Sequence, residues 1–568
     1  MSASELRDEI SLPSLTWRSW LVLAAFIVTT VFVIRPLSFR VPLPRPAAIH
    51  SLWQHPATET GLGISRWWYI GVHMDMKLTP WLVILLLLAS TAIRFGDEVV
   101  HGFVGGNGIE PYSIVILIFA LAYICISLDE SGLLSYVAVH VTSRWGHDGR
   151  VLLLCFYALS CVMAVITNND VVVLCLTPII CIFSDTTGAN AEPFLIAMFI
   201  AANTASMALF IGNPTNIIVA EANNVSFLSY SAWMGLPFLG AAVAGIAVLY
   251  LTSMRKIPRA IAIDVTIRPR DMLRRFRQAV LGSVVLVSCL IALSISSFFG
   301  VAVWIVTLPF GVAMLLIDAI IDLSTTRAMR TLESAPIPVT LSEPITYADV
   351  DASDIELQCA PAASQLAGSL SPTAIAEQPN KARIMYSARL RHRIVHGIHI
   401  LDMRVPTVSA VLRRLPYGII PFSLGMFIIV ESLSEQGWTP RLAWLLKHMC
   451  PSTAAAVFIV GAVTSLACNV LNNLPMAILF SRALQHPIFA QVDDGSRRGA
   501  MFALIIGSNV GANFTLVGSL AGLMFQGIAS QKKREIGYFT FMRWCAPVMV
   551  VQLAVSCAIL VAELVVVK

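Results

Sequence analysis

Charged residues are scarce in this chain, and their scarcity excludes an ordinary water-soluble domain. Only 12% of the 568 residues are Asp, Glu, Lys or Arg, whereas 57% are hydrophobic and the mean hydropathy is +0.78. A soluble domain carries about 25% charged residues. Composition alone therefore indicates a polytopic membrane protein.

Metal-binding and catalytic patterns are also missing. The eleven cysteines show no CxxC or Cys/His metal spacing, and Cys155, Cys161, Cys175 and Cys181 lie inside apolar stretches, as ordinary buried thiols do. No Ser/His/Asp set or haem-like spacing is present. We therefore predict no enzyme activity, no cofactor and no metal site. The net charge of +5 comes from Lys and Arg between apolar spans, which sets orientation and does not indicate nucleic acid binding.

What the chain does have is a series of long apolar stretches. Each needs about 20 residues to cross a membrane. Ten candidates lie near 19–35, 79–94, 112–128, 193–213, 231–252, 279–298, 301–321, 415–433, 498–527 and 540–566.

Two further apolar regions, 151–184 and 453–485, are interrupted at their centres by asparagines. The interruptions are Asn168-Asn169-Asp170 and Asn472-Asn473-Leu474-Pro475. A straight span would not place these residues at mid-membrane, so each region is predicted to be a re-entrant hairpin whose polar tip is shielded by protein. The fold class is therefore an all-α polytopic membrane protein with about ten spans and two re-entrant hairpins.

Polar interruptions also recur in two of the apolar spans. Asn203 precedes Gly212 by nine residues, and Asn509 precedes Gly518 by the same distance. Duplicated interruptions at corresponding places in two halves indicate discontinuous helices and the binding site of a secondary transporter. Five spans and one hairpin per half is an odd number of crossings, which predicts an inverted repeat.

The distribution of basic residues predicts orientation and domain boundaries. Segment 253–278 contains eight Lys and Arg residues and is expected in the cytoplasm, and 36–78, 143–150, 322–414 and 530–537 then lie on the same side. The predicted domains are a first inverted repeat, 1–255, with hairpin 151–184 and broken helix 193–221; a basic cytoplasmic connector, 256–278; a second inverted repeat, 279–568, with hairpin 453–485 and broken helix 498–527; and a polar cytoplasmic insertion, 327–412.

A broken helix exposes N–H groups at one end and C=O groups at the other, so the breaks and hairpin tips predict a cavity rich in amides and hydroxyls. The alternative is that these side chains only hydrogen-bond helices together. Such a cavity suits a small neutral hydroxylated solute, or an anion held by N–H groups, better than a bare transition metal. The candidate substrate-binding residues are Asn168, Asn169, Asn203, Thr204, Ser206, Asn213, Thr215, Asn216, Asn472, Asn473, Ser508, Asn509, Asn513, Thr515 and Ser519.

Asp170 is the one carboxylate beside a predicted tip. Because burial disfavours the charged form of a carboxyl group, Asp170 could carry a proton through a transport cycle, and it is the candidate for proton coupling. A purely structural role is the alternative. Glu431, Asp318 and Asp322 lie towards the ends of spans and are expected at the membrane interface.

On several short motifs the chain resembles the arsenite/antimonite efflux permeases of the ion transporter superfamily, which also includes citrate transporter-like proteins. The resemblance covers about 112–252 and 279–566. Its motifs are Asp129-Glu-Ser-Gly-Leu133, Asn169-Asp170, Leu176-Thr-Pro178, Ala205-Ser206, Phe422-Ser-Leu-Gly-Met426, Asn472-Asn473-Leu-Pro475, Gly518-Ser-Leu-Ala521 and Ser530-Gln-Lys532.

This resemblance implies a carrier that exports trivalent metalloid hydroxides, driven by protons or the membrane potential. It leaves a soluble arsenite-stimulated ATPase and a homodimer as open partners, and it makes Cys468 a minor candidate ligand. The permeases usually carry Asp at the positions of Asn203 and Asn509. The stretch Gly212-Asn213-Pro214 is closer to relatives that move silicic acid, carboxylates, chloride or sodium.

We therefore predict a secondary active transporter in the lipid bilayer, with the plasma membrane as its expected location. Its substrate would be a small inorganic solute or anion, with a proton or a sodium ion for coupling. Efflux of arsenite or antimonite is the leading prediction. The alternatives are an anion, dicarboxylate/citrate, silicic acid or sodium/proton carrier, a channel, and a membrane enzyme or receptor scaffold.

Overall fold

A computed structural model describes residues 12, 14–34, 36–44, 67–75, 77–105, 110–145, 148–253, 257, 269–296, 298–299, 301–333 and 402–567. The chain forms two compact units. The larger comprises Met1–Ile317 with Val411–Lys568, and the smaller Asp318–Ala410. Most of the predicted insertion, 327–412, and most of the connector, 256–278, lie outside the described residues.

The described part of the chain is predominantly helical, as the sequence predicts, and two strands form an antiparallel pair in which Leu37 faces Met74 and Pro44 faces Trp67. The elements before the first hairpin are α2 (Trp17–Ile34), β1 (Leu37–Pro44), β2 (Trp67–Met74), α4 (Thr79–Ala89), η1 (Phe95–Val99), α5 (Val100–Val104), α6 (Pro111–Glu130) and α7 (Leu133–Trp145). The first hairpin, the first broken helix and the elements after them are α8 (Gly149–Ile166), α9 (Asn169–Thr187), α10 (Glu192–Ala205), η2 (Phe210–Gly212), α11 (Pro214–Ala222), α12 (Phe227–Ser253), α13 (Pro269–Met272), α14 (Phe276–Ser296) and α15 (Val303–Glu333).

The remaining elements repeat the order of those from α6 to α12. They are α17 (Pro406–Arg414), α18 (Ile419–Glu435), α19 (Trp438–Met449), α20 (Thr453–Leu471), α21 (Asn473–Gln485), η3 (Phe489–Gln491), α22 (Asp494–Val510), η4 (Gly511–Asn513), α23 (Leu520–Gln531) and α24 (Tyr538–Val566). A long helix, a short helix, a hairpin, a broken helix and a final long helix occur in both series.

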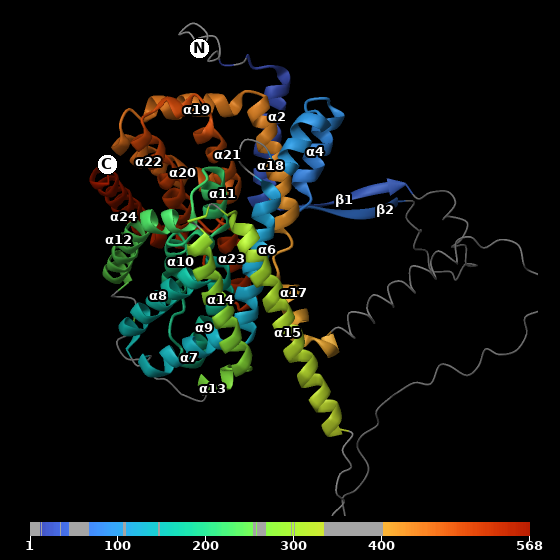
Figure 1. Ribbon diagram of the computed structural model, residues 1–568, viewed down its shortest axis with the longest axis vertical. Coiled ribbons are helices and arrows are strands. Elements are labelled where there is room, and N and C mark those ends of the chain that lie inside the picture. Colours follow the sequence, from blue (N-terminus) through green and yellow to red (C-terminus); the bar gives the residue numbers. More distant parts are fainter. Residues whose placement is uncertain are drawn as a thin grey trace, which may run out of the picture. The chain divides into compact units, whose positions relative to one another are not determined.

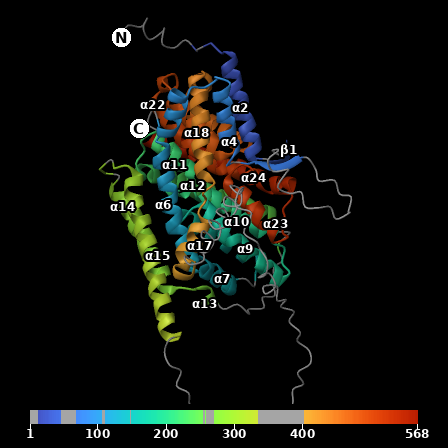
Figure 2. The ribbon, with the colours of Figure 1, turned by 90° about the vertical axis from the view of Figure 1, so that its right-hand side faces the viewer.

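The two series run in opposite directions. Helix α7, which leads into the first hairpin, lies at the bottom of Figure 1, and its counterpart α19 lies at the top. The view turned by 90° in Figure 2 likewise shows α7 low in the molecule and the second-series helices α18 and α22 high in it. This is the arrangement of an inverted-repeat transporter with discontinuous helices. The exact domain boundaries given above stay predictions.

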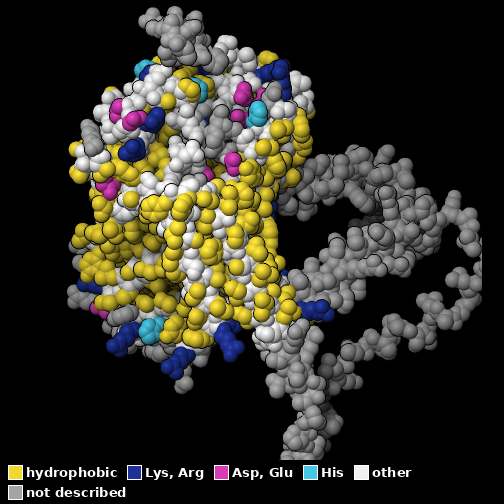
Figure 3. Space-filling model, in the orientation of Figure 1, with side chains coloured by type: hydrophobic (Ala, Val, Ile, Leu, Met, Phe, Trp, Pro, Cys, Tyr) yellow, Lys and Arg dark blue, Asp and Glu magenta, His cyan; other side chains and the backbone are white. Residues whose placement is uncertain are grey.

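Eight described helical segments are long and apolar enough to cross a membrane. Six coincide with predicted spans, and the other two, α8 and α20, are the first legs of the predicted hairpins. Predicted spans 193–213 and 498–527 are interrupted in the structure, while the apolar segments Trp17–Val33 of α2 and Thr79–Ala89 of α4 are shorter than these eight. Figure 3 shows a broad apolar band with Lys and Arg side chains gathered below it.

Carboxylates that the sequence placed at the membrane interface are buried instead. Glu431 is only 5% exposed in the larger unit. In the smaller unit Asp318 is fully buried, and Asp322 accepts hydrogen bonds from the backbone N–H and hydroxyl of Thr407, both at 2.7 Å. Position along a span alone did not reveal that Glu431 and Asp322 are buried against internal partners, and their location at the membrane interface stays a prediction.

Candidate functional site

Four helices begin at the hairpin tips and the helix breaks, and each begins with a side-chain cap. A capping side chain accepts a hydrogen bond from one of the first N–H groups, which have no partner within the helix. The caps are Asn168 for α9, Asn213 for α11, Asn472 for α21 and Ser519 for α23. The repeated asparagines of the sequence therefore start helices.

These four N-termini meet around one small cavity. It is lined by Asn169 and Asp170 of α9, Asn213, Pro214 and Thr215 at α11, Asn473 and Leu474 of α21, and Leu520 and Ala521 of α23. Its volume of about 10 Å³ is the room of about one water molecule. Both halves of the chain contribute two N-termini, as the inverted repeat requires.

The electrostatic character of this cavity follows from the direction of the helices. A helix N-terminus carries a partial positive charge and N–H groups that favour oxygen atoms or anions. Asp170 is the one carboxylate among the lining residues, and the remaining polar groups are amides and a hydroxyl. The cavity can therefore hold oxygen atoms of a small solute and, at Asp170, a proton.

The glycines of the repeated motif allow the chain to pack closely at each break. A Cβ atom on Gly212 would lie 2.1 Å from the carbonyl oxygen of Ser206, and one on Gly518 would lie 2.7 Å from Oδ1 of Asn469. Neither distance is possible without movement of the backbone or of the half-buried Asn469 amide. The Asn–Gly spacing therefore reflects the close approach of a helix break to its neighbours.

Asn509 joins the two broken helices. Its Oδ1 accepts hydrogen bonds from Ser206 Oγ and Asn213 Nδ2, both at 2.9 Å. Its Nδ2 donates to Asn216 Oδ1 at 2.7 Å and to the carbonyl of Ile505 at 2.9 Å. Asn509 is fully buried. One amide of the second half thus contacts three polar side chains of the first half.

The first hairpin tip is tied to the first broken helix by a pair of amides. Asn169 Nδ2 donates to Asn203 Oδ1 at 3.0 Å, and the two residues are 2% and 0% exposed. Asn169 Oδ1 and Asn203 Nδ2 make no hydrogen bond, although both are buried. Because a buried amide left unpaired costs free energy, and Asn169 lines the cavity, its oxygen is suited to accept a hydrogen bond from a bound hydroxyl.

A second buried cluster links the halves away from the cavity lining. Asn513 Nδ2 donates to Thr204 Oγ1 at 3.1 Å and to Gln552 Oε1 at 3.2 Å, while Gln552 Nε2 donates to Thr204 at 3.0 Å. These contacts hold the two breaks together. At the cavity lining itself, the hydroxyl of Thr215 lies 3.1 Å from that of Ser508.

The second hairpin tip is held mainly by backbone carbonyls. Asn472 Nδ2 donates to the Val517 carbonyl at 3.0 Å, and the Asn473 N–H donates to the Gly518 carbonyl at 3.0 Å. Asn472 has φ +67°, which costs energy in a residue other than glycine and often occurs at functional sites. Thr515 donates to Asn469 Oδ1 at 2.6 Å.

A larger cavity lies beside the small one, and we call it the vestibule. It has a volume of about 640 Å³ and shares Asp170, Pro214 and Leu520 with the small cavity. Asn168 also lines it. Its other lining residues come mainly from α6, α9, α23 and the stretch between α17 and α18, together with three cationic side chains, Lys77, Arg413 and Arg414.

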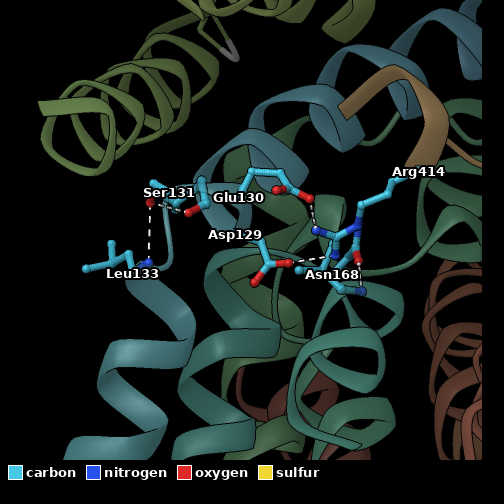
Figure 4. Close-up of polar contacts among 8 residues, drawn as sticks. Asp129, Glu130, Ser131, Leu133, Asn168 and Arg414 are labelled. Carbon is cyan, nitrogen blue, oxygen red and sulfur yellow. Dashed lines mark hydrogen bonds and ion pairs between the residues drawn. The ribbon is translucent and has the colours of Figure 1, made fainter. Parts of the chain in front are cut away.

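Arg414 makes a double ion pair beside the first hairpin tip. Its guanidinium lies 2.6 Å from Asp129 Oδ2 and 2.6 Å from Glu130 Oε1, at the end of α6. Figure 4 shows Arg414 reaching toward both carboxylates with Asn168 beside it. The partial negative charge at a helix C-terminus repels carboxylates such as Asp129 and Glu130. By neutralising them, Arg414 stabilises this end of α6 and the wall of the vestibule.

The structure brings together all the candidate substrate-binding residues, but not in one layer. Asn169, Asp170, Asn213, Thr215 and Asn473 line the small cavity. Asn168 lines the vestibule. The others form caps or the hydrogen-bonded layer behind the cavity: Asn203, Thr204, Ser206, Asn216, Asn472, Ser508, Asn509, Asn513, Thr515 and Ser519.

Sequence reasoning did not single out four polar residues near the site. Gln552 and Asn469 complete hydrogen-bonded clusters, and Arg414 and Arg482 make ion pairs. An isolated amide in an apolar span, such as Gln552 in α24, was the available signal. Cys468 is fully buried, with its thiol 3.2 Å from the Ser465 carbonyl, and lines neither the small cavity nor the vestibule.

Comparison with known proteins agrees with this architecture. Residues 66–335 match the model of the citrate transporter family, and residues 394–563 match that of the arsenical pump membrane protein family. An arsenical pump membrane protein of Yersinia enterocolitica is 26% identical over 83% of this chain and 90% of its own, and one of Escherichia coli is 25% identical over the same shares. An uncharacterized transporter of Synechocystis is 24% identical over 79% of this chain and 85% of its own.

Among solved structures, the efflux pump MtrF of Neisseria gonorrhoeae matches with a TM-score of 0.45 and 11% identity, covering 98% of this chain and 96% of that one. The two family models match successive parts of the chain and both describe membrane transporters. The chain is therefore an integral, multi-pass membrane transporter that is similar to citrate transporters and arsenical pump membrane proteins.

Proposed function

We propose that this transporter is a secondary active carrier that exports a small metalloid hydroxide, arsenite or antimonite, using protons or the membrane potential. The observation that carries the proposal is the meeting of four capped helix N-termini, two from each half, around one small cavity. A trihydroxy solute presents oxygens to N–H groups and hydroxyl hydrogens to acceptors. The unpaired Asn169 Oδ1 is such an acceptor.

The vestibule supports entry of the solute from the cytoplasm. Its three cationic residues, Lys77, Arg413 and Arg414, all fall in segments predicted to be cytoplasmic from the distribution of positive charge. Asp170 lines both the vestibule and the small cavity. A solute bound there from the cytoplasmic side would be released outside after a conformational change, with Asp170 as the proton carrier.

An anion carrier is the second candidate, and a specific observation favours it. Partial positive charge from four helix N-termini surrounds the cavity, and the citrate transporter family matches residues 66–335. An inorganic anion or a carboxylate, coupled to sodium, would use the same N–H groups. Silicic acid and sodium/proton exchange are further members of this alternative.

Transport by purified protein in liposomes separates these functions. We expect labelled arsenite to accumulate when a proton gradient is imposed, to saturate with concentration, and to be unaffected by sodium. Expression in an arsenite-sensitive cell should restore growth and lower intracellular arsenic. Sodium-dependent citrate or inorganic anion uptake without arsenite transport would contradict the metalloid proposal and support the second candidate.

A further inference from the structure

The second hairpin is fastened to α18 by a buried ion pair. Arg482 of α21 lies 2.8 Å from Glu431 of α18, and each side chain is only 6% exposed. Removing two charges from water is costly, and a well-packed apolar pair is often equally stable. The pair is therefore poorly explained by stability alone.

The ion pair joins the second leg of the second hairpin, α21, to the long helix α18. Arg482 follows the tip residue Asn473 by nine residues on one helix, a rise of about 14 Å. Glu431 lies close to the C-terminal end of α18, where the helix dipole disfavours a carboxylate. Separation of α21 from α18 would therefore break this buried ion pair.

At the equivalent positions, both of which the structure describes, the first half has no charged residues. With the spacing of 304 residues that relates the hairpin tips, Glu431 corresponds to Ser127 and Arg482 to Pro178. There Ile126 of α6 and Leu174 of α9 both line the vestibule. The second hairpin is thus joined to α18 by a buried ion pair, whereas the first hairpin lines the vestibule.

We propose that Glu431 and Arg482 are positioning residues that form a latch, which holds the second hairpin closed while the first faces the vestibule. A carrier exposes its site to one side at a time, so release of solute on the far side requires α21 to separate from α18 and the ion pair to break. The proposal depends on the protein being a carrier and not on the identity of its solute.

The latch can be tested by thiol labelling in full-length protein in liposomes. The reporter Ile478→Cys is fully buried and lies one helical turn from Arg482, on the same side of α21. A second reporter, Leu174→Cys, lines the vestibule. Maleimide labelling is read at each reporter by peptide mass spectrometry, which separates it from the native cysteines.

In Arg482→Gln or Glu431→Gln, we expect labelling at position 478 to rise about tenfold and labelling at position 174 to fall. The exchanged pair, Glu431→Arg with Arg482→Glu, should restore both rates. Arg497→Gln, which breaks the exposed pair with Asp494, is the matched control and should change neither.

Each single change removes one charge of the buried pair and keeps the other, whereas the double variant Glu431→Gln, Arg482→Gln carries neither charge. It should label at position 478 as the single variants do. Size exclusion and thermal unfolding show whether the double variant is folded. Unchanged labelling at both reporters in a folded double variant would overturn the latch. That result would leave solute transport unaffected, so failure of the latch and of the proposed substrate are distinguishable.

Discussion

Asn509 Nδ2 donates a 2.7 Å hydrogen bond to Asn216 Oδ1, so the breaks of the two discontinuous helices are joined by an amide-to-amide contact. Asn216 in turn donates to the Ser206 carbonyl at 2.8 Å, on the other side of its own break. Both asparagines are fully buried. The breaks of the two halves therefore form one connected structure.

Asn509→Ala should destabilise the protein substantially. It removes the partner of three side chains from the first half and leaves their polar atoms buried, at an expected cost of about 2–4 kcal/mol in the free energy of unfolding. Thermal or denaturant unfolding of the purified protein would measure it. Asn190→Ala, at an exposed asparagine that caps a turn, is the control and should cost less than about 0.5 kcal/mol. Equal effects at both positions would contradict the role of Asn509.

The motif Asn509–Gly518 was visible in the sequence, and so was its partner Asn203–Gly212, because amides and glycines are rare in apolar spans. Their duplication predicted that both breaks belong to one binding site, and the odd number of crossings in each half predicted the inverted repeat. The sequence did not reveal that Asn168, Asn213 and Asn472 cap helices, since the position of a helix start inside an apolar stretch depends on tertiary contacts.

The ion pairs between residues far apart in the chain could not be predicted from the sequence, for a different reason. Arg414 lies 285 residues from Asp129, and Arg482 lies far from Glu431, so no local pattern joins them. Glu431 was expected at the interface because a lone carboxylate near the end of a span is usually solvated. Its burial became evident only with its partner on another helix.

Gly212→Ala should disrupt the first break. The added methyl group would lie 2.1 Å from the Ser206 carbonyl oxygen, which forces the backbone apart. We expect loss of most transport in liposomes and a lower unfolding temperature. Gly235→Ala in α12 is the matched control, because no atom lies within 4 Å of its added Cβ and alanine favours a helix. Normal transport by Gly212→Ala would contradict the close packing described for this break.

Asp170→Asn should uncouple transport from protons. The amide keeps the shape of the side chain but cannot gain or lose a proton, so downhill exchange of solute should persist while accumulation driven by a proton gradient is lost. Transport in liposomes with and without an imposed pH difference measures both. Proton-dependent accumulation with an unchanged pH optimum in this variant would assign the proton to another group.

Arg414→Gln should destabilise the vestibule wall by leaving Asp129 and Glu130 unpaired. Because these carboxylates are largely buried but the guanidinium is 31% exposed, we expect a loss of about 2 kcal/mol, below that of a fully buried pair. The triple variant with Asp129→Asn and Glu130→Gln carries no unpaired charge and should recover most of this loss. Additive losses would show that the three side chains do not act as a unit.

The cap of α22 predicts a pH dependence at an exposed position. Hydrogen bonds from the Ser496 hydroxyl at 2.7 Å and N–H at 2.8 Å lower the pKa of Asp493. A carboxyl group whose pKa is lowered by folding stabilises the folded state at pH values above its unfolded-state pKa, which is about 3.9 for Asp. This stabilisation is lost as the pH falls through the lower pKa of the folded state. Asp493→Ala should therefore cost about 1 kcal/mol at pH 7 and less at pH 3. A cost that does not change with pH would contradict the charged cap.

Direct binding of arsenite to the purified protein tests the shared cavity most directly. Asn169 and Asn473 belong to opposite halves and line the same cavity, so Asn169→Ala and Asn473→Ala should each weaken binding about tenfold, as measured by equilibrium dialysis. Asn190→Ala should bind as the unaltered protein does. Undiminished binding in both cavity variants, with both folded, would contradict a site built jointly by the two halves.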